Sequence, residues 1–291
     1  MWISRFAKLL VVTTFFLIVA GGLVTSTRSG LAVPDWPLSY GKLMPPMVGG
    51  VRFEHSHRMI ASLVGLITFI LTFWIGFTEK RAWVRWCGIL AFFMVVTQGI
   101  LGGLTVLYSL PAPISITHGC LAQTFFAFTI CLAYFLSSEW KKGFKFGKHD
   151  LSMLKKILCL TVALIYLQLI LGAAFRHTGN KLILIPHIAG AFLVLMHMIM
   201  ALMFTWRNMP GESRFTCPAI FLALVSLIQI SLGMGSFVFS VVLRDSIPGP
   251  SLSKVFFITA HQTLGALLLG AAGFFMLRVY RIERLNFGHG I

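Results

Sequence analysis

The 291-residue sequence has few charged residues, and acidic residues are especially scarce. Charged residues make up 11% of the chain, with 8 Asp and Glu against 24 Lys and Arg, while 57% is hydrophobic and the mean hydropathy is +0.88. Because about a quarter of the residues in a soluble domain are charged, this composition excludes a soluble globular protein and indicates a membrane protein. The net charge of +16 is therefore interpreted first as a guide to membrane orientation.

The sequence also lacks the cysteine patterns of disulfide-rich and zinc-binding proteins. It has no CxxC pair and no clustered Cys/His spacing such as HxxxH, which argues against a zinc site. The five cysteines lie within predicted spans or at their cytoplasmic ends, away from any outer loop where a disulfide persists. We predict that all five are buried thiols that act as small apolar groups. They are Cys87, Cys120, Cys131, Cys159 and Cys217.

Eight apolar runs are long enough to cross the hydrocarbon core as helices. They occupy 5–27, 56–78, 83–108, 113–137, 153–175, 182–206, 216–240 and 254–278. The first run is too long for a signal peptide and is not followed by a cleavage site and a soluble domain. The predicted fold is an all-α integral membrane protein with eight transmembrane helices.

The basic residues divide unequally between the two sides of the membrane. Sixteen fall on the side of the termini and eight on the other side, so the positive-inside rule places both termini in the cytoplasm. The basic run 141–156 is then a solvated cytoplasmic loop near anionic lipid, and no nucleic-acid partner is expected. The eight outer cations are Arg28, Lys42, Arg52, Arg58, Arg176, Lys181, Arg244 and Lys254.

The two halves of the chain carry similar features. Gln98 and Gly102 in the third run recur at the same spacing as Gln229 and Gly233 in the seventh. We predict two duplicated four-helix bundles, and an even number of spans gives both copies the same orientation. The predicted halves are 1–140 and 150–291.

Four histidines lie near the outer ends of the even-numbered spans. They are His57, His118, His187 and His261. Each has an Ala or Gly four positions later, on the same helix face. Ionisable groups inside a membrane are costly and usually functional, and two histidines from facing helices are a common way to hold haem iron in a helix bundle. The alternative is that they are polar residues hydrogen-bonded between helices.

Glu54 is the most distinctive single residue. It precedes His57 by three positions on the same face, and the second half has no acidic counterpart. We interpret it as a proton acceptor or an electrostatic stabiliser at a reacting centre. The alternative is a carboxylate favoured by the helix dipole, paired with Arg52 or Arg58. The outer segment 28–55, rich in proline and aromatic residues, is predicted to form an ordered cap.

Some outer cations are expected to bind the anionic propionates of haem. Our candidates are Arg28, Arg58 and Arg176. His197 lies deeper and on another face than His187, so we predict a packing or proton-linked role for it.

Taken together, these residues resemble the haem A synthase family, and the resemblance covers nearly the whole chain. The motifs that carry it are RSG at 28–30, PDWP at 34–37, EHSHR at 54–58, THG at 117–119, RHTG at 176–179, PHIAG at 186–190 and HQTLG at 261–265. The resemblance implies oxidation of a methyl group of haem O to the formyl group of haem A, for cytochrome oxidase. It also implies the bacterial plasma (inner) membrane, with the haem sites toward the outer face.

The resemblance further implies roles for individual residues. His187 and His261 would ligate a resident haem B in the C-terminal half. His57 and His118 would face the substrate haem O, with Glu54 as the essential carboxylate. Haem O synthase and the cytochrome oxidase assembly machinery would be partners within the lipid bilayer, and a homo-oligomer is left open.

The sequence departs from the family at one place and leaves the mechanism open. Many relatives have a Cys pair flanking PDWPL, where this chain has Val33 and Ser39, so a Cys-based redox role for the loop is excluded here. An iron held by both His57 and His118 has no free position for oxygen. Either one ligand leaves, or electrons pass from the substrate haem through the resident one.

Two other classes of membrane protein are alternatives. A quinol-linked dihaem b-type electron-transfer protein usually takes two histidines about four turns apart on one helix, and none of the predicted spans has that pair. A transporter would also account for internal duplication, but transporter sites lie near the midplane, whereas these histidines lie near the outer surface.

Overall fold

The computed structural model describes residues 2–144, 150–247 and 249–286. Eight of its helices are long and apolar enough to cross a membrane, which confirms the eight predicted spans. The helices are α1 (Trp2–Ser26), α2 (Val51–Thr78), α3 (Ala82–Leu107), α4 (Ala112–Phe135), α5 (Ser138–Lys142), α6 (Ser152–Thr178), α7 (Lys181–Asn208), α8 (Ser213–Phe237), the π-helical turn η1 (Val238–Val242) and α9 (Leu252–Asn286). Part of the basic run 141–156 lies outside the described residues.

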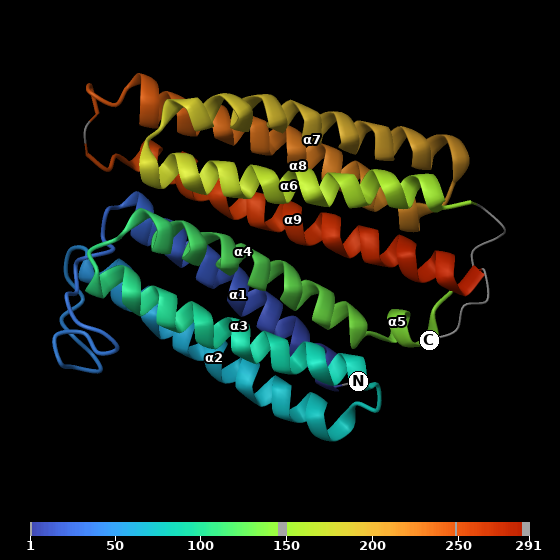
Figure 1. The fold of residues 1–291 in the computed structure, drawn as a ribbon, viewed down its shortest axis with the longest axis horizontal. Helices are drawn as coiled ribbons and strands as arrows, with labels where there is room; N and C mark the ends of the chain where they lie inside the picture. Colours follow the sequence, from blue (N-terminus) through green and yellow to red (C-terminus); the bar gives the residue numbers. More distant parts are fainter. Residues whose placement is uncertain (1, 145–149, 248, 287–291) are drawn as a thin grey trace.

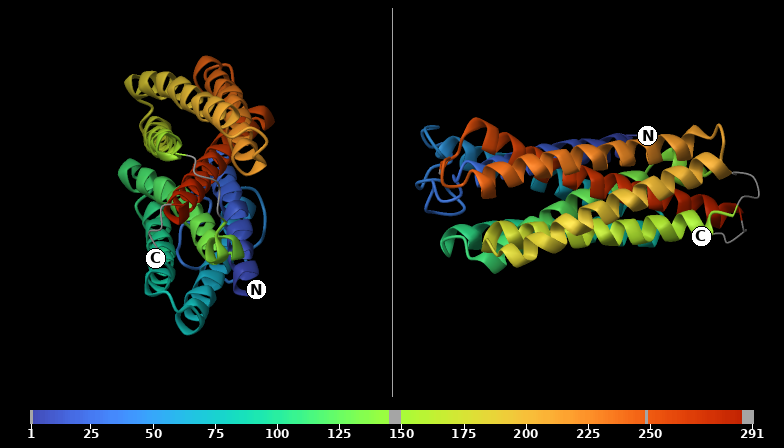
Figure 2. Two further views of the ribbon diagram at one scale, coloured as in Figure 1. Left: turned by 90° about the vertical axis from the view of Figure 1, so that its right-hand side faces the viewer. Right: turned by 90° about the horizontal axis from the view of Figure 1, so that it is seen from above.

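The long helices form two groups joined along α9. Helices α1 to α4 lie together, and α6 to α8 lie together above them in Figure 1. Helix α9 runs between the groups and contacts α1, α4, α6 and α8, while α4 also contacts α6 (Figures 1 and 2). The two halves predicted from the sequence therefore share one central helix.

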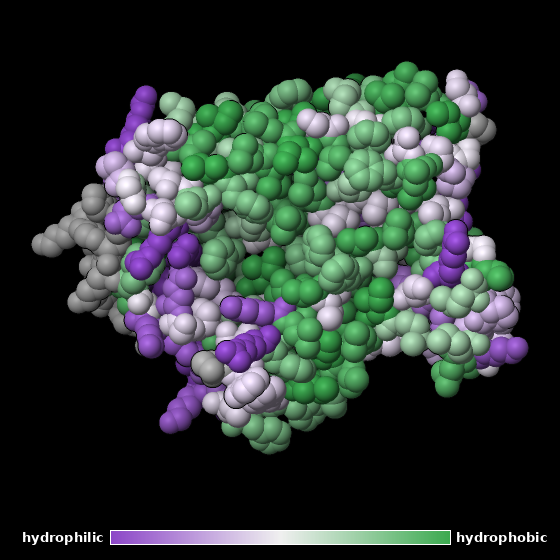
Figure 3. Space-filling view, turned by 180° about the vertical axis from the view of Figure 1, so that it is seen from behind, coloured by the Kyte–Doolittle hydropathy of each residue, from purple (hydrophilic) through white to green (hydrophobic). Residues whose placement is uncertain are grey.

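The bundle has two distinct ends. Helix α1 begins and α9 ends at one of them, here called the terminal end, and the 27–50 loop lies at the other, the loop end (Figure 1). The space-filling view in Figure 3 shows a broad apolar band with hydrophilic residues gathered at both ends. This is the surface of a multi-pass membrane protein, and the assignment of the terminal end to the cytoplasm stays a prediction.

Apolar side chains form the interior of each group and of the seam between them. One cluster fills the space among α6 to α9 and another the space among α1 to α4. Ile18, Phe126 and Ala266, from α1, α4 and α9, form a third cluster at the seam. Close by, the hydroxyls of Ser26 and Thr259 are 2.8 Å apart and buried. The position of α9 is thus fixed by contacts from both halves.

Ion pairs link the helices at the terminal end. Glu79 accepts bonds of 2.9 Å from Arg81 Nε and Nη2, and Lys141 Nζ lies 3.3 Å from it. The Arg81 hydrogen bonds lower the pKa of Glu79 to about 2. Arg278 Nε of α9 donates to Glu139 of α5 at 2.7 Å. These pairs join α5 to the α2–α3 turn and to α9.

The cysteines only partly match the prediction. Cys87, Cys120 and Cys131 are half-buried, but Cys159 and Cys217 are exposed on the surface of the protein. The prediction that all five are buried in the protein is therefore wrong for two of them. The reason is that an apolar residue of a membrane span is equally stable facing lipid, so hydropathy alone does not distinguish the lipid surface from the interior.

Candidate functional site

The four membrane histidines lie at similar depths near the loop end. His57, His118 and His187 each stand six residues after the first residue of their helix, and His261 stands nine residues after it. At about 1.5 Å per residue this is roughly 9 to 14 Å inside each helix start. The structure therefore brings the predicted residues to one end of the bundle, as the sequence pattern indicates.

Local sequence features set these depths in the C-terminal half. Gly179 ends α6 in the left-handed conformation, with φ of +68°, which glycine adopts without a steric penalty. Asn180 then caps α7, because its side chain accepts a bond of 2.9 Å from the Leu182 N–H. This tight turn places Arg176, at the end of α6, beside the helix that carries His187.

Each histidine ring lies against a glycine of the preceding long helix. A Cβ atom on Gly172 or on Gly233 would lie 2.9 Å from Cε1 of His187 or of His261, respectively. In the N-terminal half, a Cβ on Gly21 would lie 3.2 Å from His57 Nε2, and one on Gly102 would lie 3.4 Å from His118 Cε1. The rings thus occupy space that any larger residue would fill. These contacts are missing from the sequence-based predictions.

A sequence signal for these glycines exists. Three of them follow a glutamine by four positions, as in Gln98–Gly102, Gln168–Gly172 and Gln229–Gly233, and Leu17 stands at the same place before Gly21. The glutamines contact the histidine helices, since Gln98 Nε2 donates to the His118 carbonyl at 3.2 Å and Gln229 Nε2 to the His261 carbonyl at 2.9 Å. The spacing alone does not reveal which helix the glycine faces.

His187 and His261 form a facing pair. Their ring centroids are 6.2 Å apart and the ring planes are nearly perpendicular, at 88°. The His261 Nδ1–H donates to the Gln229 carbonyl at 3.1 Å. Because a carbonyl only accepts, this bond fixes the tautomer and leaves the lone pair on Nε2 free. A second nitrogen bonded to a carbonyl is the usual arrangement of a metal-ligating histidine.

The pair fits a haem better than a bare metal ion. A metal–imidazole bond is about 2 Å long, so two rings on opposite sides of one ion have centroids about 6 Å apart, close to the observed separation. Within the described residues no group of three or more His, Cys, Asp or Glu side chains gathers to hold a metal. Two histidines with a porphyrin supplying the remaining ligands satisfy an iron. The adjoining glycines leave room beside the rings.

His57 and His118 come from facing helices of the N-terminal half. The two side chains interact electrostatically, and His118 Nδ1 is buried with no hydrogen-bond partner among the described residues. An unpaired buried nitrogen is costly, which favours a ligand at this position. Thus the structure places both predicted histidine pairs where each pair can act together.

Glu54 is buried and fully engaged. Its exposed fraction is 3%, its Oε1 accepts from Arg58 Nη2 at 2.6 Å, and its Oε2 accepts from the Val33 N–H at 2.9 Å. Of the two alternatives for its partner, Arg58 is the one observed. Through these two bonds Glu54 ties α2 to the 27–50 loop.

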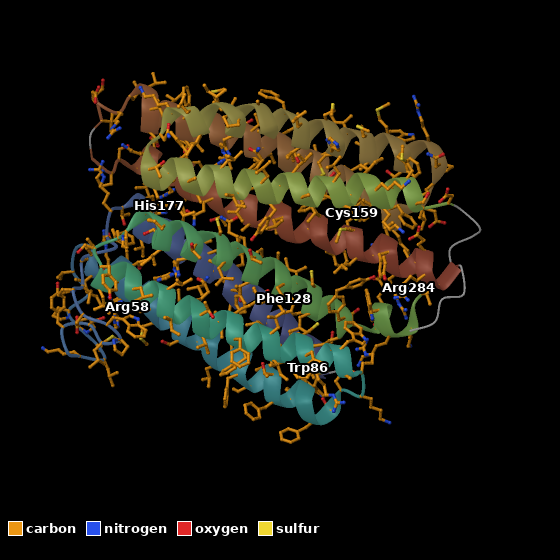
Figure 4. The ribbon with its side chains drawn as sticks, in the orientation of Figure 1. Arg58, Trp86, Phe128, Cys159, His177 and Arg284 are labelled. Carbon is orange, nitrogen blue, oxygen red and sulfur yellow. The ribbon has the colours of Figure 1, made fainter. Side chains whose placement is uncertain are left out.

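Arg58 holds the loop through its other nitrogen. Nη1 donates to the carbonyls of Asp35 and Leu38 at 2.7 and 2.6 Å. The guanidinium therefore joins two loop carbonyls to Glu54, and Figure 4 shows Arg58 next to the loop. Because its donors are used in this way, Arg58 is less available to a haem propionate than the sequence suggested.

The loop itself is a folded cap. The Asp35 carboxylate accepts from the N–H groups of Tyr40 and Gly41 at 2.7 and 2.8 Å, and these bonds hold its pKa below the usual value. The Trp36 ring lies on Gly103 of α3, where an added Cβ would come within 2.7 Å of it. Ser39 is buried and its hydroxyl lies 2.9 Å from His55 Nδ1. The loop is thereby fixed to both α2 and α3.

The remaining candidate residues lie in different surroundings near the loop end or deeper in the bundle. Arg176 is half-buried, interacts electrostatically with His261, and has no hydrogen bond or ion pair within the described part of the chain. Arg28 is exposed and lines a hollow at the loop end. His197 donates from Nδ1 to the Leu193 carbonyl of its own helix at 2.8 Å. His177, labelled in Figure 4, lies where α6 faces α4.

The fold is that of a multi-pass helical membrane protein, with two pairs of histidines near the loop end of the bundle. The model of the COX15-CtaA family, described as cytochrome oxidase assembly protein, matches residues 4–49 and 51–193. The match covers more than half of the chain, and the chain belongs to this family. It includes His57, His118 and His187 and ends before His261.

Sequence similarity to individual proteins is consistent with this family membership. The Heme A synthase of Lysinibacillus sphaericus (strain C3-41) is 29% identical over 191 residues, which cover 62% of this chain and 60% of the relative. That of Exiguobacterium sibiricum is 28% identical over 182 residues, covering 61% and 60%. The chain thus matches about three fifths of the length of these two relatives. The Heme A synthase of Bacillus licheniformis is 24% identical over 304 aligned positions, covering 94% of each chain.

Proposed function

We propose that this chain is a haem A synthase, an oxidoreductase that converts a methyl group of haem O into the formyl group of haem A. The observation that carries the proposal is the facing pair His187 and His261, with centroids 6.2 Å apart, in a membrane protein of the cytochrome oxidase assembly family. Similarity to Heme A synthases supports the reaction type. The protein would act in a bacterial plasma membrane, with the loop end outside.

His187 and His261 would hold a resident haem B. When bound, that group supplies one-electron chemistry, and the protein supplies binding and orientation. The Gln229 carbonyl fixes the His261 ring through Nδ1, and Gly172 and Gly233 keep bulk away from both rings. Arg176 is the best-placed partner for a propionate, because it adjoins His261 and has no carboxylate partner among the described residues.

His57 and His118 would receive the substrate haem O. Gly21 and Gly102 stand against their rings as their counterparts do in the other half. The 27–50 loop covers this end of α2 and α3, so it excludes water from the outer side of the site.

We further propose that Glu54 is needed for conversion but not for binding of the resident haem. Through Arg58 and the Val33 N–H it sets the position of the loop one turn from His57, and its negative charge stabilises positive charge that develops nearby. Glu54→Gln should keep the b-type absorbance and lower haem A formation by about a hundredfold. Glu139→Gln, at the terminal end, is the control and should keep the rate; an active Glu54→Gln protein would contradict this role.

Pigment extraction after co-expression with haem O synthase tests the function as a whole. Haem A should accumulate with the wild-type chain and not with an empty vector. Haem O recovered unchanged from a pigmented protein would instead support the dihaem electron-transfer alternative, and a colourless protein would exclude both. Haem O synthase and the cytochrome oxidase assembly machinery are the partners that this proposal implies.

A further inference from the structure

A hollow of about 640 Å³ opens at the loop end, over the seam between α1 and α9. One wall is built from the 27–50 loop and the start of α2, and the other from residues 250–255, where α9 begins. Arg28 and Arg52 line it on the first side, and Ser251 on the second. The hollow is separate from the histidine pairs, since none of the four histidines contributes to its lining.

The hollow is strongly basic. Besides Arg28 and Arg52, the nearby Lys254 lies close enough to Arg28 and Arg244 to interact with both electrostatically. Asp245 follows Arg244 directly and Glu54 lies two residues after Arg52, but no salt bridge joins a carboxylate to any of these four cations within the described residues. Like charges gathered without a counter-charge are destabilising, so an anion bound here would offset their repulsion.

Lys254 adds a buried cation to this group. Its exposed fraction is 9%, and its ammonium group donates to the Ile247 carbonyl at 3.3 Å, which uses one of three donors. Burying a charge without a counter-charge costs several kcal/mol. The starts of α2 and α9 also line the hollow, so the positive ends of two helix dipoles add to the positive potential.

The rim of the hollow is apolar. Leu252 has an exposed fraction of 89% and Phe256, one turn later on the same face of α9, of 58%. Leu31 on the opposite wall is exposed as well. Basic residues next to exposed aliphatic and aromatic side chains at a helix start are typical of the level of lipid headgroups. A free inorganic ion would gain nothing from contact with these apolar side chains, whereas a lipid acyl chain would pack against them.

We propose that this hollow binds the phosphate-bearing headgroup of an anionic phospholipid, with the acyl chains running down past Leu252 and Phe256. Arg28 and Arg52 would contact the phosphate, and Lys254 would contribute its charge from behind. Since the lining comes from both halves, the lipid would join the 27–50 loop to α9. The proposal is independent of the reaction catalysed.

Native mass spectrometry of the full-length protein in detergent tests this site. Phosphatidylglycerol should be retained in preference to phosphatidylcholine. In the double variant Arg28→Gln/Arg52→Gln the affinity for phosphatidylglycerol should fall roughly ten- to thirtyfold, because each basic residue near an anionic lipid contributes about 1 kcal/mol. The variant Lys254→Gln, which leaves the lining residues unchanged, should bind phosphatidylglycerol several-fold more weakly than the wild type. Size-exclusion profiles verify that each variant is folded.

Lys42→Gln is the matched control, because it removes an outer cation of the same loop that does not line the hollow. It should bind phosphatidylglycerol like the wild type. Equal binding of the two lipids, or an equal loss in the control, would overturn the proposal. Displacement of the lipid by an equal concentration of inorganic phosphate, or by a porphyrin dicarboxylate, would also overturn it, since the hollow would then serve a different anion.

Discussion

Each of the four membrane histidines stands against a glycine, so the space beside each ring is defined by a missing side chain. The contacts are closest at Gly172 and Gly233, where an added Cβ would lie 2.9 Å from a ring carbon. Such a distance is too short for two carbons, and the ring would have to move. The orientation of the ligand pair therefore depends on residues that carry no chemistry of their own.

Alanine substitution at these glycines should reduce haem binding. We expect Gly172→Ala and Gly233→Ala to contain several-fold less haem per protein, measured from the absorbance of the purified protein, because a shift of about 1 Å misaligns a metal ligand. Gly273→Ala on α9 is the control, since its added Cβ meets no described atom within 4 Å. Full haem content in both test variants would show that the rings adapt.

The histidines themselves allow a sharper experiment. His187→Ala and His261→Ala should each lose nearly all of the b-type absorbance, because one imidazole cannot provide both axial ligands. His197→Ala should keep it, because His197 bonds to its own helix. Loss of pigment in His197→Ala but not in the other two would mean that the ligands have been misassigned.

The candidate site residues could be predicted where an ionisable side chain interrupts an apolar run. Placing such a side chain in a membrane span is energetically unfavourable, and this argument led to the prediction of His57, His118, His187, His261 and Glu54. Hydrogen bonds from side chains to the backbone have no comparable signal in the sequence. The engagement of Arg58 with the Asp35 and Leu38 carbonyls, and of Glu54 with the Val33 N–H, depends on how a 24-residue connection between α1 and α2 folds.

Among the elements, the 27–50 loop has a conformation that the periodicity of the sequence could not predict. Its order comes from point contacts to α2 and α3, made by Arg58, by His55 with Ser39, and by Trp36 on Gly103. The helices, in contrast, follow directly from apolar run length, because backbone groups in lipid must be bonded within the segment. Their ends lie within five residues of the predicted bounds, except that α9 continues past 278 to Asn286 through a polar stretch that hydropathy does not assign to the span.

The α2–α3 turn and α5 provide a prediction about pH. Glu79 has a pKa lowered to about 2 by Arg81, so its ion pair stabilises the fold above the ordinary glutamate pKa and loses that effect as the pH falls from about 4.5 toward 2. Glu79→Gln should lower the free energy of unfolding by about 1 kcal/mol at pH 7.

The difference between this variant and the wild type should shrink as the pH falls through that window, as measured by thermal unfolding in detergent. Arg85→Gln is a suitable control, because it removes a nearby cation that makes no described ion pair. A difference that stays constant down to pH 2 would mean that the effect of Glu79→Gln does not come from the carboxylate charge.

For the whole molecule, the number of long apolar helices follows from hydropathy, and the distribution of Lys and Arg predicts their orientation. Impermeant maleimide should label Lys42→Cys in intact cells and Lys142→Cys only after permeabilisation, because the positive-inside rule places α5 in the cytoplasm. The unmodified chain, with its five native cysteines, provides the background. The opposite labelling pattern would invert the topology and place the histidines toward the cytoplasm.

How the two helix groups meet could not be predicted from the sequence. Hydropathy reports that a face is apolar but not whether lipid or another helix covers it, as the exposed Cys159 and Cys217 illustrate. The seam depends on small features such as Gly22, where an added Cβ would lie 3.0 Å from Thr259. The likeness of the halves predicts two duplicated four-helix bundles but not the contacts between them, in which α9 packs against helices of both groups.

The central place of α9 has a consequence for how the protein is made. Helix α9 leaves the ribosome after the other described helices, yet it contacts α1 and α4, two of the helices that surround His57 and His118. That half therefore waits, through the synthesis of four more spans, for the segment that completes its packing. A chain truncated before Leu252 would lose His261 together with the α9 contacts of α1, α4, α6 and α8, so the packing around both histidine pairs would be incomplete.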